Sequence, residues 1–312
     1  MTQLARALEP LAAIERIAAA QPEAVSTLAR VDDLPIHAFT FGTGAPVLLV
    51  VGGVHGLERI GTEVALAFLA SLVTRLGWDQ ILQDALARCR VIVVPLLNPV
   101  GMARAQRANG NGVDLMRNAP AHAMGGTPLL GGQRISPHLP WYMGAAGAPM
   151  EPEARALVEL VEAEVATAPF AVALDCHSGF GFVDRLWYPY ARTREPLPDQ
   201  PAIAALGRLL DTTLPNHVYR LEQTAQAYTI RGDLWDYLYD RRRAAGPGVL
   251  LPLTLEMGSW AWVRKNPLQG LSSLGRFNPI KPHRQRRTLR RHLPLLDFLL
   301  AATASHGAWL PR

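Results

Sequence analysis

The amino-acid sequence predicts an α/β fold built around a buried β-sheet. Short, continuous runs of β-branched and aliphatic residues occur at residues 47–52, 91–94 and 171–175, and such runs are typical of strands covered on both faces. Longer segments between them place apolar residues at helical spacing, which indicates helices packed on the sheet. With 312 residues, the chain is long enough for one large domain with a substantial core.

The same patterns locate the individual elements along the chain. We expect helices at residues 4–20, 59–76, 79–88, 149–166, 201–214, 232–243 and 282–304, and strands at residues 36–41, 47–52, 91–98, 171–175, 217–221 and 249–255. Residues 99–148 have little periodicity, and a loop of that length is typically functional or disordered. Because no linker or repeat divides the sequence, we expect a single domain over residues 1–312, with an N-terminal helical segment at 1–30 and a C-terminal helix at 282–312.

Composition and charge indicate the cellular setting. The two cysteines, Cys89 and Cys176, lie in apolar runs, so we expect no disulfide framework and a reducing compartment. The N-terminus lacks a signal-peptide pattern, and no stretch approaches ~20 uncharged apolar residues, so we expect a cytoplasmic protein without a membrane partner. The net charge of +5 is mild, and the basic run at residues 283–292 lacks interleaved aromatic residues. We interpret this run as a solvated helix face and expect no nucleic-acid partner.

Polar residues that could perform chemistry follow the predicted strands. His55 and Glu58 come directly after the strand at 47–52, where two glycines allow a sharp turn, and their spacing lets both side chains reach one point. His177 and Glu256 lie at the ends of two later strands. Ligands bind at the carboxyl edge of open α/β sheets, where these groups would meet. Two histidines and a glutamate form an open three-ligand zinc site, so the sequence predicts the zinc-binding loop of a hydrolase.

The order and spacing of these motifs resemble those of the carboxypeptidase A-like metallocarboxypeptidases. The sequence His-Gly-Leu-Glu at residues 55–58 is similar to the family's zinc motif His-x-x-Glu. Other segments resemble family elements in the same order: Asn-Pro-Val-Gly at 98–101, Asn-Gly-Val-Asp-Leu-Met-Arg-Asn at 111–118, Pro-Glu-Ala-Arg at 152–155, Asp-Cys-His-Ser at 175–178 and Leu-Thr-Leu-Glu at 253–256. Because these segments span most of the chain, we interpret it as a bacterial, cytoplasmic-type member of this family.

The resemblance implies both a fold and a set of catalytic residues. The implied fold has three α/β/α layers around a mixed, mostly parallel, twisted sheet of about eight strands. His55, Glu58 and His177 would hold one Zn²⁺ ion per chain. Glu256 would act as the general base. Arg107 would stabilise the oxyanion of the tetrahedral intermediate, because a fixed guanidinium aimed at developing charge is effective there.

The resemblance also implies a set of substrate-binding residues, with one departure. Arg117 would bind a substrate carboxylate through its bidentate fork. The family pairs this arginine with an asparagine, but Met116 stands there and cannot form strong hydrogen bonds, so Asn118 would have to compensate. Tyr228 would close over the substrate. Independently of the resemblance, Arg231 and Asp233 lie in the same segment as Tyr228, and we expect them to line the pocket of the leaving residue, where a basic lining would suit an acidic side chain.

The sequence therefore predicts a zinc-dependent hydrolase that cleaves an amide bond. We expect a metallocarboxypeptidase that acts on peptides or on cell-wall peptide fragments. The alternative within a related fold is an N-acyl amino acid amidohydrolase of the succinylglutamate desuccinylase/aspartoacylase type, whose substrate would be an acyl-amino acid. A more distant alternative is a catalytically inactive binding module that keeps the fold. The sequence does not indicate an oligomeric state.

Overall fold

Eight strands form one mixed sheet in the part of the chain that the computed structural model describes, residues 3–120 and 127–311. Across the sheet the strands follow the order β1-β2-β4-β3-β5-β8-β6-β7, and the four central ones run parallel. The predicted mixed, mostly parallel sheet of about eight strands is confirmed. The strands are β1 (Val25–Val31), β2 (Leu34–Phe41), β3 (Val47–Gly52), β4 (Arg90–Val94), β5 (Phe170–Ser178), β6 (Arg185–Tyr188), β7 (Arg220–Gln223) and β8 (Val249–Met257).

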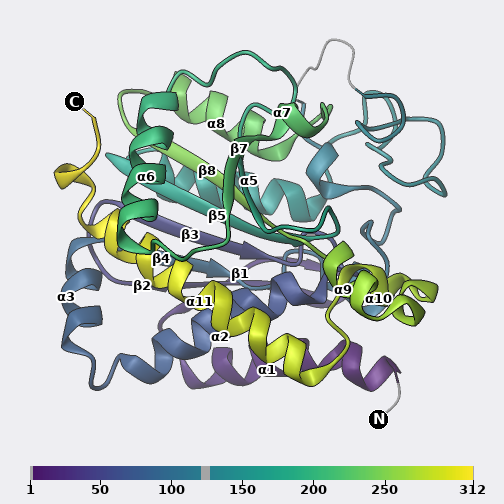
Figure 1. Cartoon of the computed structure of the whole chain (residues 1–312), viewed down its shortest axis with the longest axis horizontal. Helices are drawn as coiled ribbons and strands as arrows, with labels where there is room; N and C mark the ends of the chain where they lie inside the picture. Colours follow the sequence, from purple (N-terminus) through teal and green to yellow (C-terminus); the bar gives the residue numbers. More distant parts are fainter. Residues whose placement is uncertain (1–2, 121–126, 312) are drawn as a thin grey trace.

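Helices cover both faces of this sheet, as Figure 1 shows. One apolar cluster packs α1, α2, α3, α6 and α11 against one face, and a second cluster packs α5 and α8 against the other. Among the described residues no single helix is long and apolar enough to cross a membrane. The helices are α1 (Gln3–Ala20), α2 (Arg59–Arg75), α3 (Gln80–Arg88), α4 (Pro99–Ala103), η1 (Leu115–Arg117), α5 (Pro152–Val165), α6 (Gln200–Thr213), α7 (Thr224–Ala227), α8 (Leu234–Ala244), α9 (Trp260–Lys265), η2 (Pro267–Leu271), α10 (Ser273–Phe277), α11 (Pro282–Ala304) and η3 (His306–Ala308).

The central strands β3, β5 and β8 are buried along almost their whole length. Their residues alternate between the two clusters, so both faces of each strand need apolar side chains, which explains the continuous apolar runs. In the parallel register Gly52 lies beside Cys176, and His177 lies beside Glu256. The carboxyl ends of three neighbouring strands therefore meet at one edge of the sheet.

Three outer segments differ from the sequence-based expectation. Residues 25–31 form the edge strand β1, although we expected them to belong largely to an N-terminal helical segment. Its exposed and half-buried residues lack the long apolar run that marks a buried strand. Strand β6, only four residues long, was not predicted, and the strand expected at 217–221 begins at Arg220. Short strands give little periodicity, and their existence depends on tertiary pairing.

Helix α2 approaches strand β5 so closely that only glycine fits at residue 61. A Cβ atom on Gly61 would lie 2.1 Å from the carbonyl oxygen of Cys176. We expect Gly61→Ala to lower the free energy of unfolding by about 3 kcal/mol, because the helix and strand must separate. Gly77→Ala is the control, since nothing lies within 4 Å of its Cβ position, and it should change stability by less than about 0.5 kcal/mol. Urea unfolding of both variants tests this, and equal midpoints would contradict the close approach.

Candidate active site

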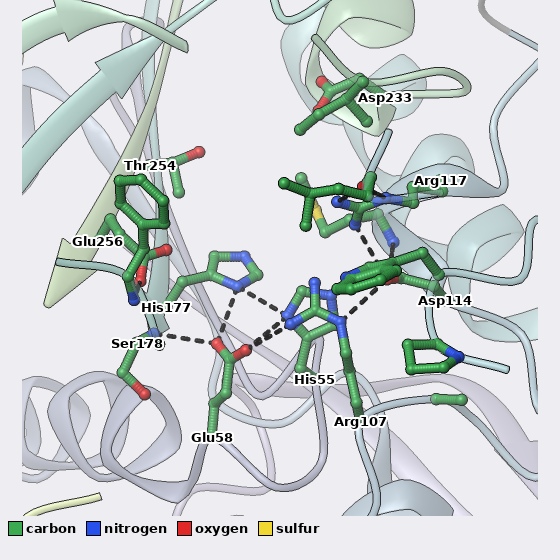
Figure 2. A pocket seen from close by; sticks show the side chains of 18 of the residues that line it. His55, Glu58, Arg107, Asp114, Arg117, His177, Ser178, Asp233, Thr254 and Glu256 are labelled. Carbon is green, nitrogen blue, oxygen red and sulfur yellow. Dashed lines mark hydrogen bonds and ion pairs between the residues drawn. The ribbon is translucent and has the colours of Figure 1, made fainter. Parts of the chain in front are cut away.

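Three potential metal ligands converge at the carboxyl edge of the sheet (Figure 2). His55 and Glu58 lie in the turn between β3 and α2, and His177 lies near the end of β5. The Nδ1 atoms of the two histidines are 3.1 Å apart. The Glu58 carboxylate lies 2.9 Å from Nδ1 of His55 and 3.1 Å from Nδ1 of His177. All three side chains are buried, so their orientations are fixed by the fold.

The outer nitrogens of both imidazoles face carboxylates. Nε2 of His55 donates a hydrogen bond to Asp114 at 3.0 Å. Nε2 of His177 lies 2.8 Å from Asp175, although without the angle of a hydrogen bond, and Trp235 donates to the same carboxylate oxygen. These carboxylates favour the proton on Nε2 and leave the lone pairs on Nδ1. Burial would lower the pKa of His177, but the carboxylates of Asp175 and Glu58 hold it well above its usual value. The space between the two Nδ1 atoms and Glu58 therefore attracts positive charge, and the donor set fits zinc.

Glu58 is held in its ionised form by its surroundings. Burial alone would raise its pKa, but the neighbouring His55 and His177 outweigh this effect and hold the pKa of Glu58 below its usual value. The backbone N–H of Ser178 also donates to the carboxylate at 2.9 Å. Arg107 donates to its other oxygen through Nη1, also at 2.9 Å. An ionised carboxylate at this position is the form that binds a metal.

Asp114 is the central residue of the site that the sequence analysis did not single out. Its side chain is 1% exposed and accepts from His55, from Nε of Arg107 at 3.0 Å and from Nη1 of Arg117 at 2.9 Å. Burial would raise the pKa of Asp114, but the two guanidinium groups hold it well below its usual range. Asp114 lies inside the motif at residues 111–118, so its position was available in the sequence. Its role as a shared hydrogen-bond acceptor could not be read from the sequence, because the three residues that donate to it meet only in the folded chain.

Glu256 lies at the end of β8 beside His177 of the neighbouring strand. Its Oε1 accepts a hydrogen bond from the backbone N–H of Phe180 at 2.8 Å. Burial, followed by the negative charge of Glu58, raises the pKa of Glu256 to about 8. A cation held by Glu58 would act in the opposite direction. A carboxyl group whose pKa lies near neutrality can both accept and return a proton.

These groups line a cavity of about 830 Å³. Arg107, Arg117, Met116 and Tyr228 contribute to its wall together with the three ligands and Glu256. The ring of Tyr228 lies 5.8 Å from the ring of Phe180, centroid to centroid, within an aromatic cluster. Burial raises its pKa, so the hydroxyl is neutral and can donate a hydrogen bond.

Two of the predicted substrate-binding residues, Asn118 and Arg231, lie outside the set of described residues that line this cavity. Asn118 donates to the carbonyl of Met143 and accepts from the backbone N–H of Glu151, so its amide holds two loop segments together. Arg231 is exposed. The expected role of Arg231 at the pocket of the leaving residue stays a prediction.

Comparison with known structures identifies the fold. The structure of bovine thrombin-activatable fibrinolysis inhibitor in complex with tick carboxypeptidase inhibitor superposes with a TM-score of 0.69, at 17% identity, over 96% of this chain and 97% of that chain. Carboxypeptidase A from Helicoverpa armigera gives a TM-score of 0.68 at 19% identity, over 94% of this chain and 72% of that chain. At these identities the likeness concerns the fold alone.

Sequence comparison extends the likeness to the family level. The chain is 24% identical to carboxypeptidase A1 of Rattus norvegicus over 199 residues and 27% identical to carboxypeptidase D of Mus musculus over 156 residues. These regions cover 58% and 47% of this chain, but only 44% and 9% of the two relatives. A family model described as zinc carboxypeptidase matches residues 11–261, which include every ligand and Glu256. The chain therefore belongs to the zinc carboxypeptidase family.

Proposed function

We propose that this protein is a zinc-dependent carboxypeptidase that hydrolyses the last amide bond of a peptide. The observation that carries the proposal is the convergence of His55, Glu58 and His177 at one point, with Glu256 beside them on the adjacent strand. The cavity next to these residues also contains two arginines whose guanidinium groups are fixed by buried carboxylates. A metal site, a base and fixed positive charges are the components that amide hydrolysis needs.

The residues of the chain have separate tasks in this reaction. When bound, zinc supplies Lewis-acid polarisation of the scissile carbonyl and lowers the pKa of a water molecule. Glu256 takes a proton from the attacking water and returns it to the leaving nitrogen. Arg107 uses N–H groups that do not contact Glu58 or Asp114 to stabilise the negative charge that develops on the carbonyl oxygen. Its side chain is 22% exposed and faces the cavity, so a substrate can reach it.

Arg117 is the proposed anchor for the C-terminal carboxylate of the substrate. Contacts within the described chain use three of its five N–H groups, one to Asp114 and two to the carbonyl of Leu130. One N–H on each terminal nitrogen is left for a carboxylate, which matches a bidentate contact. Met116 lines the same cavity and supplies no second donor, so the neutral hydroxyl of Tyr228 is the proposed partner of Arg117.

The far end of the cavity suggests which leaving residues fit. Asp233 lies beyond Arg117 on the side away from the metal ligands (Figure 2), and burial raises its pKa to about 6. At pH 7.5 this carboxyl group is largely ionised, so an acidic leaving residue would meet a negative charge. We propose neutral or basic leaving residues in place of the acidic ones that a lining by Arg231 would have favoured.

A matched set of substrates tests the anchor and the pocket together. We expect N-benzoyl-glycyl-leucine to be hydrolysed with a kcat/KM at least ~100-fold higher than its C-terminal amide, because the amide leaves Arg117 without a negative partner. N-benzoyl-glycyl-lysine should be cleaved faster than N-benzoyl-glycyl-glutamate at pH 7.5. Equal rates for the acid and the amide would contradict the role of Arg117, and preference for glutamate would contradict that of Asp233.

Metal content provides an independent test of the ligand set. We expect His177→Asn to lower bound zinc from about one equivalent to less than about 0.1 after dialysis, because two remaining ligands hold the ion far more weakly. His37→Asn is the control, since His37 is also buried and bonded to a carboxylate, Glu15, but lies on β2 away from the site. Elemental analysis measures the zinc content of both variants. Zinc retained by the His177 variant would exclude this histidine as a ligand.

A further inference from the structure

Exposed apolar side chains gather around the mouth of the catalytic cavity. Within the described residues, eleven large hydrophobic side chains are exposed, and eight of them lie in segments 129–141, 177–182 and 260–280. Each of these segments also contributes residues to the cavity wall. Large apolar side chains that are exposed around a cavity are a feature of interaction surfaces. The eight are Leu129, Ile135, Leu139, Phe182, Trp260, Leu268, Leu271 and Ile280.

One side of this mouth is also strongly basic. Residues 257–296 contain nine Lys and Arg residues and no Asp or Glu. Removing these nine from the 31 basic residues of the chain leaves 22 against 26 acidic ones, so the remainder carries a net charge of −4. The positive charge of the protein is therefore concentrated in this one segment. We call residues 260–287, which include α9, η2, α10 and the first turns of α11, the basic rim.

Hydrogen bonds within the basic rim fix the segment that carries its two most exposed apolar side chains, Leu268 and Leu271, which we call the apolar tips. Leu268 and Leu271, on η2, are 76% and 82% exposed. The side-chain amide of Gln269 between them donates to the carbonyls of Gly275 and Asn278. Arg284 of α11 donates to two carbonyls near the end of α9. Their exposure is therefore built into an ordered surface that lies at one end of the molecule (Figure 1).

Several cations of the basic rim are free to meet an external anion. Lys265, Lys281 and Arg286 are exposed, and none of them forms an ion pair with a carboxylate in the described part of the chain. Arg276 lies at the junction, because it lines both the catalytic cavity and an adjoining cavity of about 520 Å³. The charged surface thus continues directly into the cavity mouth.

We propose that the basic rim docks on the surface of an anionic lipid membrane. Leu268 and Leu271 enter the interface between headgroups and acyl chains, and the surrounding cations contact the anionic headgroups. The most exposed apolar side chains of the rim, Leu268 and Leu271, are aliphatic and favour lipid over nucleic acid, because bases gain affinity by stacking on aromatic rings. The ring of Trp260 already packs against those of Phe180 and Phe182. Docking places the cavity mouth at the membrane, so substrates at that surface reach the active site. The expectation of no membrane partner rested only on the lack of a spanning segment, which surface docking does not require.

Vesicle binding by the full-length protein tests this proposal. We expect co-sedimentation with vesicles of phosphatidylcholine and 30% phosphatidylglycerol at 0.05 M NaCl, with an affinity at least ~10-fold higher than for pure phosphatidylcholine. Binding should weaken at 0.5 M NaCl, because salt screens exposed charges. No binding to the anionic vesicles, or equal binding to both kinds, would overturn the proposal.

Variants with matched controls separate the apolar and the electrostatic contributions. The double variant Leu268→Ser with Leu271→Ser should bind about 10-fold more weakly. The triple variant Lys265→Gln, Lys281→Gln and Arg286→Gln should lose about 100-fold, since each cation near an anionic surface contributes about fivefold. The controls are Trp78→Ser with Ile81→Ser, and Arg16→Gln with Arg88→Gln and Arg208→Gln, all exposed and outside the basic rim.

The vesicle affinities of the control variants, and binding of the protein to a single-stranded oligonucleotide, decide whether the proposal holds. The proposal is supported if the control variants bind vesicles within about twofold of the wild type and only the rim variants lose affinity. Equal losses in rim and control variants would overturn it, because binding would then reflect general charge. Tighter binding to a single-stranded oligonucleotide than to the anionic vesicles, weakened by the same rim variants, would overturn it in favour of nucleic acid.

Discussion

Replacing Glu256 with Gln is expected to lower kcat by about 10³-fold while leaving zinc bound. The side chain keeps its size and can still accept from the N–H of Phe180, but an amide cannot take a proton from water at neutral pH. General base catalysis contributes roughly 10²–10⁴ in rate, which sets the size of the effect. Because Glu256 is not one of the three converging ligands, zinc content should stay at about one equivalent.

Glu63→Gln is the matched control for this experiment. Burial also raises the pKa of Glu63, to about 7, but this residue lies on α2, outside the described lining of the cavity. We expect its substitution to leave kcat within about twofold of the wild type. Steady-state kinetics with N-benzoyl-glycyl-leucine measures both variants. A Glu256 variant with nearly full activity would show that another residue is the base, and a wild type inactive on all peptides tried would favour a binding role for the fold.

Replacing Asp114 with Asn is expected to weaken zinc binding and destabilise the fold together. The variant leaves Arg117, which is 1% exposed, without its negative partner, and removing one member of a buried ion pair costs about 3–5 kcal/mol. It also removes the carboxylate that orients His55, and loss of such a partner typically lowers metal affinity about 10- to 100-fold. Urea unfolding of the metal-free protein and competition with a zinc chelator measure the two effects.

Asp184→Asn separates metal binding from general stability. Asp184 is buried too, and it accepts from Arg291 and from the backbone N–H of Gly258, away from the metal ligands. This control should lower the free energy of unfolding without changing zinc affinity. If Asp114→Asn binds zinc as tightly as the wild type, the contact to His55 does not position the ligand, and Asp114 serves only to neutralise the arginines.

The central part of the fold and the metal site could be predicted because their signals are local. A strand buried on both faces must be apolar at every position, so β3, β5 and β8 stand out in the sequence. Ligands that follow such strands are then brought together by parallel packing alone. The family and its zinc cofactor, inferred from motifs in order, are confirmed by the match over residues 11–261.

The peripheral parts could not be predicted because their structure depends on distant contacts. Asn118 carries a side chain suited to substrate binding, but the loop at 143–151 folds back and occupies its amide. The sequence favours a solvated face for the basic run of α11, and its position beside α9 depends on tertiary contacts such as those of Arg284 with two carbonyls of α9.

The position of Asp114 has a consequence for how this protein can change over evolution. One carboxylate serves a metal ligand, the arginine proposed to act on the transition state and the arginine proposed to grip the substrate. A substitution that adjusts any one of these functions disturbs the other two, so selection cannot tune them separately at this residue. New substrate preferences should therefore arise at wall residues such as Thr254 or Ile230, which line the cavity without belonging to this shared group.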